Sequence, residues 1–275
     1  MESANRWVFL DGHYKEEHLA TLPLADRGFQ FGDGVFTTVR LSNGQPELLQ
    51  HHMERIYRHA EVVGFSIPPI AVSMIETLIE LNEATMGIWR LKIIATAAGE
   101  GSRRRLGHLL MMMAPYEWQL FRPVRLAVFP HLMERPLAEV KSLSYLDYLY
   151  AEHHALCQGA DEAIICGRDG VILETNRSNL FWIHESICFI PDERLPYLKG
   201  VFLQKLKRVM PYPIQPVEVK VGALPPAAHL FICNSMTHLR PVLSIEGVTF
   251  QRSGETEALL KQSLEQELFK STIMD

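Results

Sequence analysis

The first half of the chain alternates short apolar runs with helical patterns, which restricts it to a mixed fold of sheet and helices. Asn43-Gly44 separates two apolar runs and accepts positive φ at both residues, so this pair predicts a β-hairpin. Hydrophobic spacing predicts two helices and then two strands, over residues 51–63, 71–85, 89–98 and 108–117. Gly64 would close the first of these helices. We therefore expect an α+β domain over residues 1–114.

The second half begins after a short stretch without periodicity. Prolines bracket polar and aromatic residues there, so we expect a linker over residues 115–123. A second domain, residues 124–275, would follow it. Its runs and turn residues predict a strand, a helix, a hairpin, another strand and another helix, at residues 124–130, 144–158, 162–174, 179–183 and 201–210.

Composition and charge exclude several classes of protein. With 275 residues and 47% apolar content, the chain can bury a large core. Its formal net charge is −5 and it has no run of basic residues, which argues against nucleic acid or an anionic membrane as the main partner. The N-terminus lacks the apolar core of a signal peptide, and no uncharged apolar stretch reaches ~18 residues. The four cysteines form no CxxC pair, so we expect reduced thiols and a cytoplasmic protein.

Lys141 is the single charged residue in the run VKSLSYL, residues 140–146. A lysine in such a run commonly lies on the surface, where its methylenes cover apolar neighbours. The other interpretation is a desolvated nucleophile with a lowered pKa. Glu174 ends the strand-like run VILE and is open to the same question, because a strand-end carboxylate usually lies in solvent.

Two further residues have the chemistry to bind an anion. Gly200 precedes a predicted helix, whose free N–H groups and positive dipole end suit a phosphate. Arg55 lies on the helix expected over 51–63, where an arginine is most often solvated. Neither feature is specific by itself.

Adjacent histidines raise the possibility of a metal site. The pairs His51-His52 and His153-His154 would point about 100° apart on a helix. Neither pair has a carboxylate or thiolate at zinc-ligand spacing, so we expect no metal. A GxSxG motif for serine catalysis is also absent from the sequence.

A lysine nucleophile, a carboxylate on a later strand, and an arginine with a helix start are the parts that a pyridoxal phosphate enzyme needs. The lysine binds the cofactor covalently and must lose its proton to do so. The carboxylate keeps the pyridine nitrogen protonated, so that the ring can accept electrons. The arginine and the helix N–H groups anchor the phosphate.

Several motifs spread over almost the whole chain carry a resemblance to a known family: DRGFQFGDGVFTTVR, LLQHHMERI, VKSLSYL, GADEAIICGRDGVILETNRSNLFWI, LKGVF and FICNSMTHLRPV. In order and spacing they resemble the class IV (fold type IV) pyridoxal phosphate enzymes. That family includes branched-chain and D-amino acid aminotransferases and 4-amino-4-deoxychorismate lyase. The resemblance implies a two-domain α/β (α+β) fold like that of D-amino acid aminotransferase, with a barrel-like sheet in the C-terminal domain. It also implies pyridoxal 5'-phosphate as cofactor, an amino substrate with a carboxylate, and a homodimer.

The resemblance assigns roles to individual residues. Lys141 would be the Schiff-base lysine and proton carrier, and Glu174 the partner of the pyridine nitrogen. The cofactor phosphate would be held by an arginine, two backbone N–H groups and a hydroxyl, from Arg55, Val201, Phe202 and Ser235. Met236 replaces a residue that is small in many relatives.

The FTTxR motif at residues 36–40, together with NLFW and ICN, resembles the aminodeoxychorismate lyases. These enzymes convert 4-amino-4-deoxychorismate to p-aminobenzoate and pyruvate in folate synthesis. The resemblance makes Thr38 a candidate catalytic residue, because its hydroxyl could relay a proton to the departing enolpyruvyl group. Packing of β-branched residues in a strand explains Thr37 and Thr38 equally well.

The lyase substrate has two carboxylates, so a basic clamp is expected. Arg103 aligns with a loop arginine of lyases and D-amino acid enzymes, although glycines around it also suit a loop without a ligand. Arg177 is the second candidate, but it departs from the lyase pattern, and KSLSYL resembles the D-amino acid enzymes. An aminotransferase acting on D-amino or branched-chain amino acids is therefore the alternative. A binding protein without cofactor is a third possibility, which a colourless, inactive preparation would favour.

Overall fold

The computed structural model describes residues 6–99, 101–117 and 122–271, apart from the side chains of residues 102 and 265–271. The chain divides into two compact units. The first unit contains Met1–Trp118 and Val140–Tyr145, and the second contains Gln119–Glu139 and Leu146–Asp275. The expected linker, residues 115–123, spans the first change of unit, and its residues 118–121 lie outside the described part. Lys141 belongs to the first unit, because its segment returns to the N-terminal sheet.

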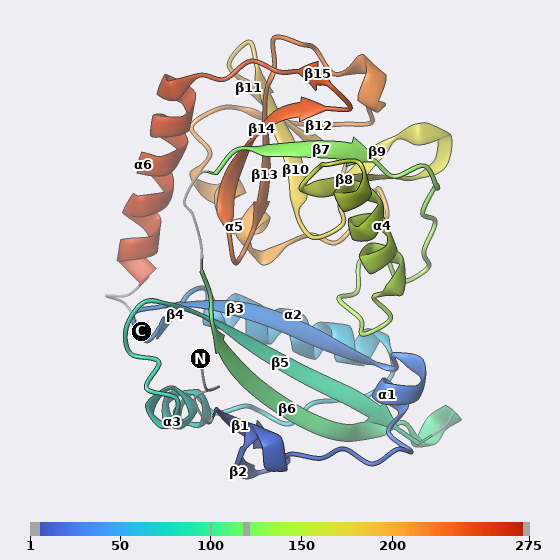
Figure 1. Ribbon diagram of the computed structural model, residues 1–275, viewed down its shortest axis with the longest axis vertical. Coiled ribbons are helices and arrows are strands. Elements are labelled where there is room, and N and C mark those ends of the chain that lie inside the picture. The colour runs from blue at the N-terminus through green and yellow to red at the C-terminus, as the bar shows by residue number, and fades with distance from the viewer. Residues whose placement is uncertain (1–5, 100, 118–121, 272–275) are drawn as a thin grey trace. The chain divides into compact units, whose positions relative to one another are not determined.

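The first unit is built on an antiparallel six-stranded sheet with the strand order β2-β1-β6-β5-β3-β4 (Figure 1). Its strands are β1 (Trp7–Leu10), β2 (His13–Glu16), β3 (Gly34–Ser42), β4 (Gln45–Pro46), β5 (Ile88–Ala98) and β6 (Arg105–Pro115). Its helices are α1 (Arg27–Phe31), α2 (Leu49–Val62) and α3 (Val72–Leu81), with short 3-10 turns η1 (Glu17–Leu19) and η2 (Gly101–Arg103). These bounds confirm the expected helices and strands of the first half.

The predicted hairpin is confirmed at the end of β3. Ser42 pairs with Gln45, and the two residues between them have positive φ, 49° at Asn43 and 77° at Gly44. The helix α2 packs against the long strand β3 (Figure 1). The buried side chains between α2 and β3 include Met53, Ile56, Ala60, Val35, Val39 and Leu41.

The second unit contains a nine-stranded mixed sheet with the order β12-β11-β10-β13-β14-β7-β8-β9, and β15 pairs with β14. Its strands are β7 (Val124–Val128), β8 (Glu162–Cys166), β9 (Ile172–Thr175), β10 (Asn179–His184), β11 (Ile187–Pro191), β12 (Ile214–Val217), β13 (His229–Asn234), β14 (His238–Ile245) and β15 (Val248–Thr249). Its helices are α4 (Leu146–Cys157), α5 (Val201–Val209) and α6 (Gly254–Ser271), with turns η3 (Arg168–Gly170) and η4 (Val221–Ala223). The sheet curls around its own core (Figure 1). This mixture of helices and curled sheets confirms the α/β (α+β) fold class.

The helices and the cysteines relate to the expectations about membrane segments and disulfides. The helices of the described residues are all too short or too polar to cross a membrane. All four cysteines are free thiols, three of them buried.

Candidate functional site

Lys141 lies in a short segment that joins the edge of β3. The Phe36 N–H donates to the Lys141 carbonyl at 3.0 Å, and the Leu143 N–H donates to the Gly34 carbonyl at 2.9 Å. The side chain of Val140 belongs to the core of the first unit. Since successive side chains of an extended segment point to opposite faces, that of Lys141 points away from this core.

The Lys141 ammonium lies against two aromatic rings. Its Nζ is 4.5 Å from the centre of the Phe36 ring and 5.5 Å from that of Tyr145. These rings contact each other edge to face, with centres 5.6 Å apart. An ammonium over ring faces gains electrostatic attraction while losing water. The lysine is therefore half-buried in a defined place and is not a solvated surface residue.

A second lysine, Lys92, shares this surface and was not singled out from the sequence. Its Nζ is 4.8 Å from the Phe36 ring centre, and burial, together with the charge of Arg90, lowers the pKa of Lys92. The sequence signal that could have identified Lys92 is its position inside the run RLKII, between apolar residues. We use the name lysine face for the surface formed by Phe36, Lys141 and Lys92.

The two threonines of β3 have opposite environments. Thr38 is half-buried, pairs with Lys92 across the sheet, and lies two residues after Phe36, so its side chain is on the lysine face. Thr37 points to the other face and is completely buried toward α2. Packing inside the first unit therefore explains Thr37, whereas Thr38 is only half-buried and lies on the lysine face.

Thr37 is part of a buried hydrogen-bonded group with Arg55 and His52. Arg55 Nη2 lies 2.7 Å from Thr37 Oγ1, and His52 Nδ1 lies 2.8 Å from the same oxygen. Burial and nearby positive charge hold the pKa of His52 well below its usual value, so the imidazole is neutral. We assign the hydroxyl as acceptor from Arg55 and donor to His52, because a guanidinium can only donate and the single hydroxyl hydrogen is then directed at the ring nitrogen.

Arg55 is a buried cation that lacks an anionic partner among the described residues. It is 6% exposed, and burial, with the like charge of Arg58, lowers its pKa to about 10, so it stays charged at neutral pH. Arg55 Nε and His52 Nε2 have no hydrogen-bond partner within the described part of the chain. Since an unpaired buried charge is strongly unfavourable, this arrangement suits an external anion such as a phosphate.

In the second unit, Glu174 on β9 is buried rather than solvated. It is 6% exposed, and Tyr148 of α4 donates to Glu174 Oε1 at 2.7 Å. The Arg135 guanidinium stacks over the Tyr148 ring at 4.8 Å. A buried carboxylate oriented by a tyrosine hydroxyl is suited to accept a hydrogen bond from a ring N–H.

The start of α5 is fixed by Asn179 of β10. The Asn179 side chain accepts from the Gly200 N–H at 3.1 Å and donates to the Leu198 carbonyl at 2.7 Å. A Cβ at Gly200 would lie 2.2 Å from Asn179 Oδ1, so only glycine fits this cap. The first N–H groups of a helix have no acceptor within the helix, and here they belong to Val201 and Phe202.

Ser235 lies in the turn between β13 and β14, and Asn234 organises this turn. Asn234 Oδ1 accepts from the N–H groups of Met236 and Thr237 at 2.9 and 2.8 Å, and Nδ2 donates to Ser178 Oγ at 2.9 Å. Ser235 is half-buried. The asparagine of the ICN motif therefore holds the backbone of the turn that contains Ser235.

The two arginines expected to bind substrate differ in environment. Arg103 is exposed in η2. Arg177 lies among acceptors of its own unit, with distances of 2.8 Å to Glu152 Oε1, 3.3 Å to Glu162 Oε1 and 3.1 Å to the Asp161 carbonyl.

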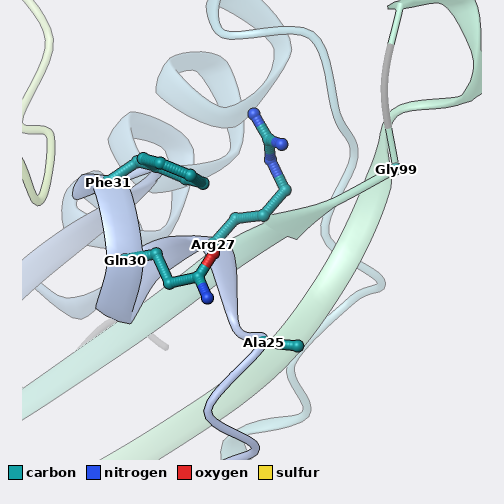
Figure 2. A pocket seen from close by; sticks show the side chains of 5 residues that line it. All are labelled: Ala25, Arg27, Gln30, Phe31 and Gly99. Atoms are coloured by element: carbon teal, nitrogen blue, oxygen red, sulfur yellow. The ribbon is translucent and has the colours of Figure 1, made fainter.

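A pocket in the first unit lies beside α1 (Figure 2). Its lining residues are Ala25, Arg27, Gln30, Phe31 and Gly99, which include none of the predicted site residues. The guanidinium of Arg27 lies 5.3 Å from the Phe31 ring centre and donates to Asp33 at 2.9 Å. Arg104 also donates to Asp33, at 2.6 and 3.1 Å. The positive charge beside this pocket is thus paired within the protein.

The predicted site residues divide between the two units. The first unit holds Lys141, Thr38, Arg55 and Arg103, and the second holds Glu174, Val201, Phe202, Ser235 and Arg177. Sequence reasoning missed four buried or half-buried residues that contact them or share their surface: Lys92, His52, His59 and Tyr148.

Comparisons with known proteins agree on one family. The family described as amino-transferase class IV matches residues 34–245. The D-alanine aminotransferase of Listeria monocytogenes is 25% identical over 96% of both chains. The aminodeoxychorismate lyase of Bacillus subtilis is also 25% identical, over 95% of this chain and 94% of its own. The crystal structure of a branched-chain aminotransferase from Thermoproteus uzoniensis superimposes with a TM-score of 0.87 at 20% identity, covering 97% of this chain and 96% of its own.

Proposed function

Because the chain belongs to the class IV aminotransferase family, whose members depend on pyridoxal 5'-phosphate, we propose that it is a lyase that acts on 4-amino-4-deoxychorismate. The products would be p-aminobenzoate and pyruvate. The family gives the cofactor and the fold, and the specific reaction is inferred from the residues below.

Both units would contribute to cofactor binding. Lys141 would form the covalent link, and Glu174, oriented by Tyr148, would bind the pyridine N–H. Arg55 would pair with the phosphate, which would supply the anion that its buried guanidinium lacks. The N–H groups of Val201 and Phe202 and the hydroxyl of Ser235 would donate to the same phosphate.

The bound cofactor supplies an electron sink for the substrate carbon that carries the amine. Lys141 would remove the proton from this carbon. The C–O bond to the enolpyruvyl group would then break, the ring would become aromatic, and the enolpyruvyl group would gain a proton and leave as pyruvate. Atoms balance without a second substrate, which distinguishes this reaction from transamination.

The position of Thr38 is the observation that carries the lyase proposal. Its hydroxyl is on the lysine face with Phe36, whose ring contacts both Lys141 and Lys92. A hydroxyl there can deliver a proton to the departing enolpyruvyl group, whereas a carboxylate would be a poor proton donor at neutral pH. Lys92 and Arg103 provide positive charge for substrate carboxylates, and Arg177 is retained as a third candidate.

Fluorescence of p-aminobenzoate tests this proposal directly. Purified protein with pyridoxal phosphate would be mixed with enzymatically generated 4-amino-4-deoxychorismate in the absence of an amino acceptor. We expect p-aminobenzoate and pyruvate in equal amounts, and no product from the Lys141→Ala variant. A yellow protein that makes no p-aminobenzoate would contradict the lyase assignment.

An aminotransferase acting on D-amino or branched-chain amino acids is the second candidate. It is supported by the Listeria relative, which matches as closely as the Bacillus lyase, and by the KSLSYL motif around Lys141. The discriminating measurement is glutamate formation from 2-oxoglutarate with D-alanine or L-leucine. Lys141 would serve as proton carrier in that reaction too.

The proposed setting combines the cytoplasm expected from the cysteine pattern with the homodimer implied by the family resemblance. We expect a cytoplasmic homodimer whose partner is a small amino substrate with a carboxylate, in folate synthesis if the lyase assignment holds. Sedimentation of the purified protein would test the dimer.

A further inference from the structure

The helix α2 presents three buried polar side chains on one side. His52, Arg55 and His59 are spaced by three and four residues, so they lie along a single face of the helix. Their exposed fractions are 0%, 6% and 4%. His52 and Arg55 are bonded to Thr37, as described above, which leaves the role of His59 to be explained.

His59 accepts a hydrogen bond from the backbone of Lys141. The Lys141 N–H lies 3.0 Å from His59 Nδ1. This bond requires an unprotonated Nδ1, because a protonated imidazole donates at both nitrogens. Burial, with the positive charges of Arg55, Arg58 and Lys141, lowers the pKa of His59 to about 3. The imidazole therefore stays a neutral acceptor throughout the physiological range.

The peptide groups on both sides of Lys141 are held by different elements. Its N–H is bonded to His59 of α2, and its carbonyl accepts from the Phe36 N–H of β3 at 3.0 Å. Phe36 is also the residue whose ring contacts the Lys141 ammonium. The helix and the strand together thus fix the backbone from which the lysine side chain projects.

From this geometry we propose that His59 is a positioning residue for Lys141, which orients the lysine backbone so that the amine points onto the lysine face. The inference rests on the proposed role of Lys141 as the covalent anchor. It holds equally for the lyase and the aminotransferase, because both need the same lysine. A displacement of about 1 Å at a reacting group can slow a reaction about a hundredfold.

Two variants separate hydrogen bonding from packing. His59→Leu keeps much of the volume but removes the acceptor, whereas His59→Asn keeps an amide oxygen that can accept near the position of Nδ1. The rate of covalent capture would be measured by adding pyridoxal phosphate to each full-length apoprotein, trapping with borohydride, and quantifying the Lys141 peptide by mass spectrometry. Binding of pyridoxamine 5'-phosphate, which forms no covalent bond with the lysine, reports on the remainder of the site. Thermal unfolding of each apoprotein reports on the fold.

We expect His59→Leu to slow capture about tenfold or more, with pyridoxamine phosphate affinity changed less than about threefold, and His59→Asn to restore most of the rate. Capture by His59→Leu at the wild-type rate would overturn the proposal. So would equal slowing in both variants, or a parallel loss of pyridoxamine phosphate binding and thermal stability in His59→Leu, since each indicates packing alone. Failure of the proposed anchor is recognised separately, because the wild type would then give no reduced adduct at Lys141.

Discussion

Tyr148 and Glu174 are joined by a 2.7 Å hydrogen bond in which the phenol donates to a buried carboxylate. The bond links the first turn of α4 to β9. It orients the Glu174 carboxylate through its Oε1 atom. This relationship gives Glu174 a fixed direction before any cofactor binds.

The variant Tyr148→Phe should weaken cofactor binding. Removing a hydrogen bond to a charged group costs roughly 1.5–3 kcal/mol, so we expect pyridoxal phosphate affinity to fall about tenfold or more. Equilibrium titration of the apoprotein would measure it. Tyr150→Phe is the matched control, because Tyr150 is on the same helix but is 56% exposed. Equal affinities for the two variants would show that the Tyr148 hydroxyl does not support Glu174.

The variant Lys141→Ala should lose turnover altogether. The reason is that no other group would form the covalent link or carry the proton at the substrate carbon. Product formation and borohydride-fixed colour would be measured together. Lys92→Ala tests the neighbouring lysine, and we expect it to keep the fixed colour while raising KM. Full activity in Lys141→Ala would refute the assignment of the anchor.

The variants Thr38→Val and Thr38→Ser test the proton relay. General acid catalysis contributes about a hundredfold or more, so we expect Thr38→Val to lose kcat by about that factor and Thr38→Ser to keep most of it. Steady-state assay of p-aminobenzoate release measures both. If Thr38→Val retains wild-type kcat, the residue serves only strand packing.

The variant Thr37→Val should destabilise the protein by about 1–3 kcal/mol, because Arg55 and His52 would lose a buried partner. Thr37→Ser keeps the hydroxyl and should remain near the wild type. Urea unfolding of the apoproteins gives the free energies. The increase in the free energy of unfolding on addition of pyridoxal phosphate is a second readout. It should be smaller in Thr37→Val, because Arg55 would be displaced. Identical unfolding curves for Val and Ser would contradict the hydrogen-bonded group.

The buried histidines predict acid sensitivity below about pH 6.5. The folded-state pKa of His59 is about 3, whereas an unfolded histidine titrates near 6.5. The unfolded chain therefore binds more protons between these values. The folded state keeps its full stability above about pH 6.5 and loses stability as the pH falls below that value. Each such histidine contributes a slope of about 1.4 kcal/mol per pH unit, and His52, whose pKa is lowered in the same direction, adds a second.

Comparison of the wild type with His59→Asn isolates one of these protons. Between about pH 7 and pH 5, the free energy of unfolding of the variant should fall by roughly 2 kcal/mol less than that of the wild type. Chemical denaturation of the apoproteins at the two pH values would measure the difference. Equal losses in both proteins would indicate that His59 takes up its proton in the folded state as readily as in the unfolded chain.

The sequence by itself determined the elements and the chemistry of single residues. The Asn43-Gly44 hairpin, the helix that carries Arg55 and the glycine before α5 follow from local rules, since turn conformation and hydrophobic spacing act over a few residues. The motif resemblance also gave the family, because the order of motifs along the chain is preserved. Lys141 and Glu174 were proposed as site residues from the same motifs.

Only the tertiary structure decided the environments of these residues. It returned the segment of Lys141 to the N-terminal sheet, and it separated Thr37, buried beside Arg55, from Thr38 on the lysine face. It also brought His59 to the Lys141 backbone, although 82 residues separate them in the sequence. Such contacts depend on how distant strands and helices pack. Burial, which keeps His59 a neutral acceptor at physiological pH, is a property of that packing and not of the local sequence.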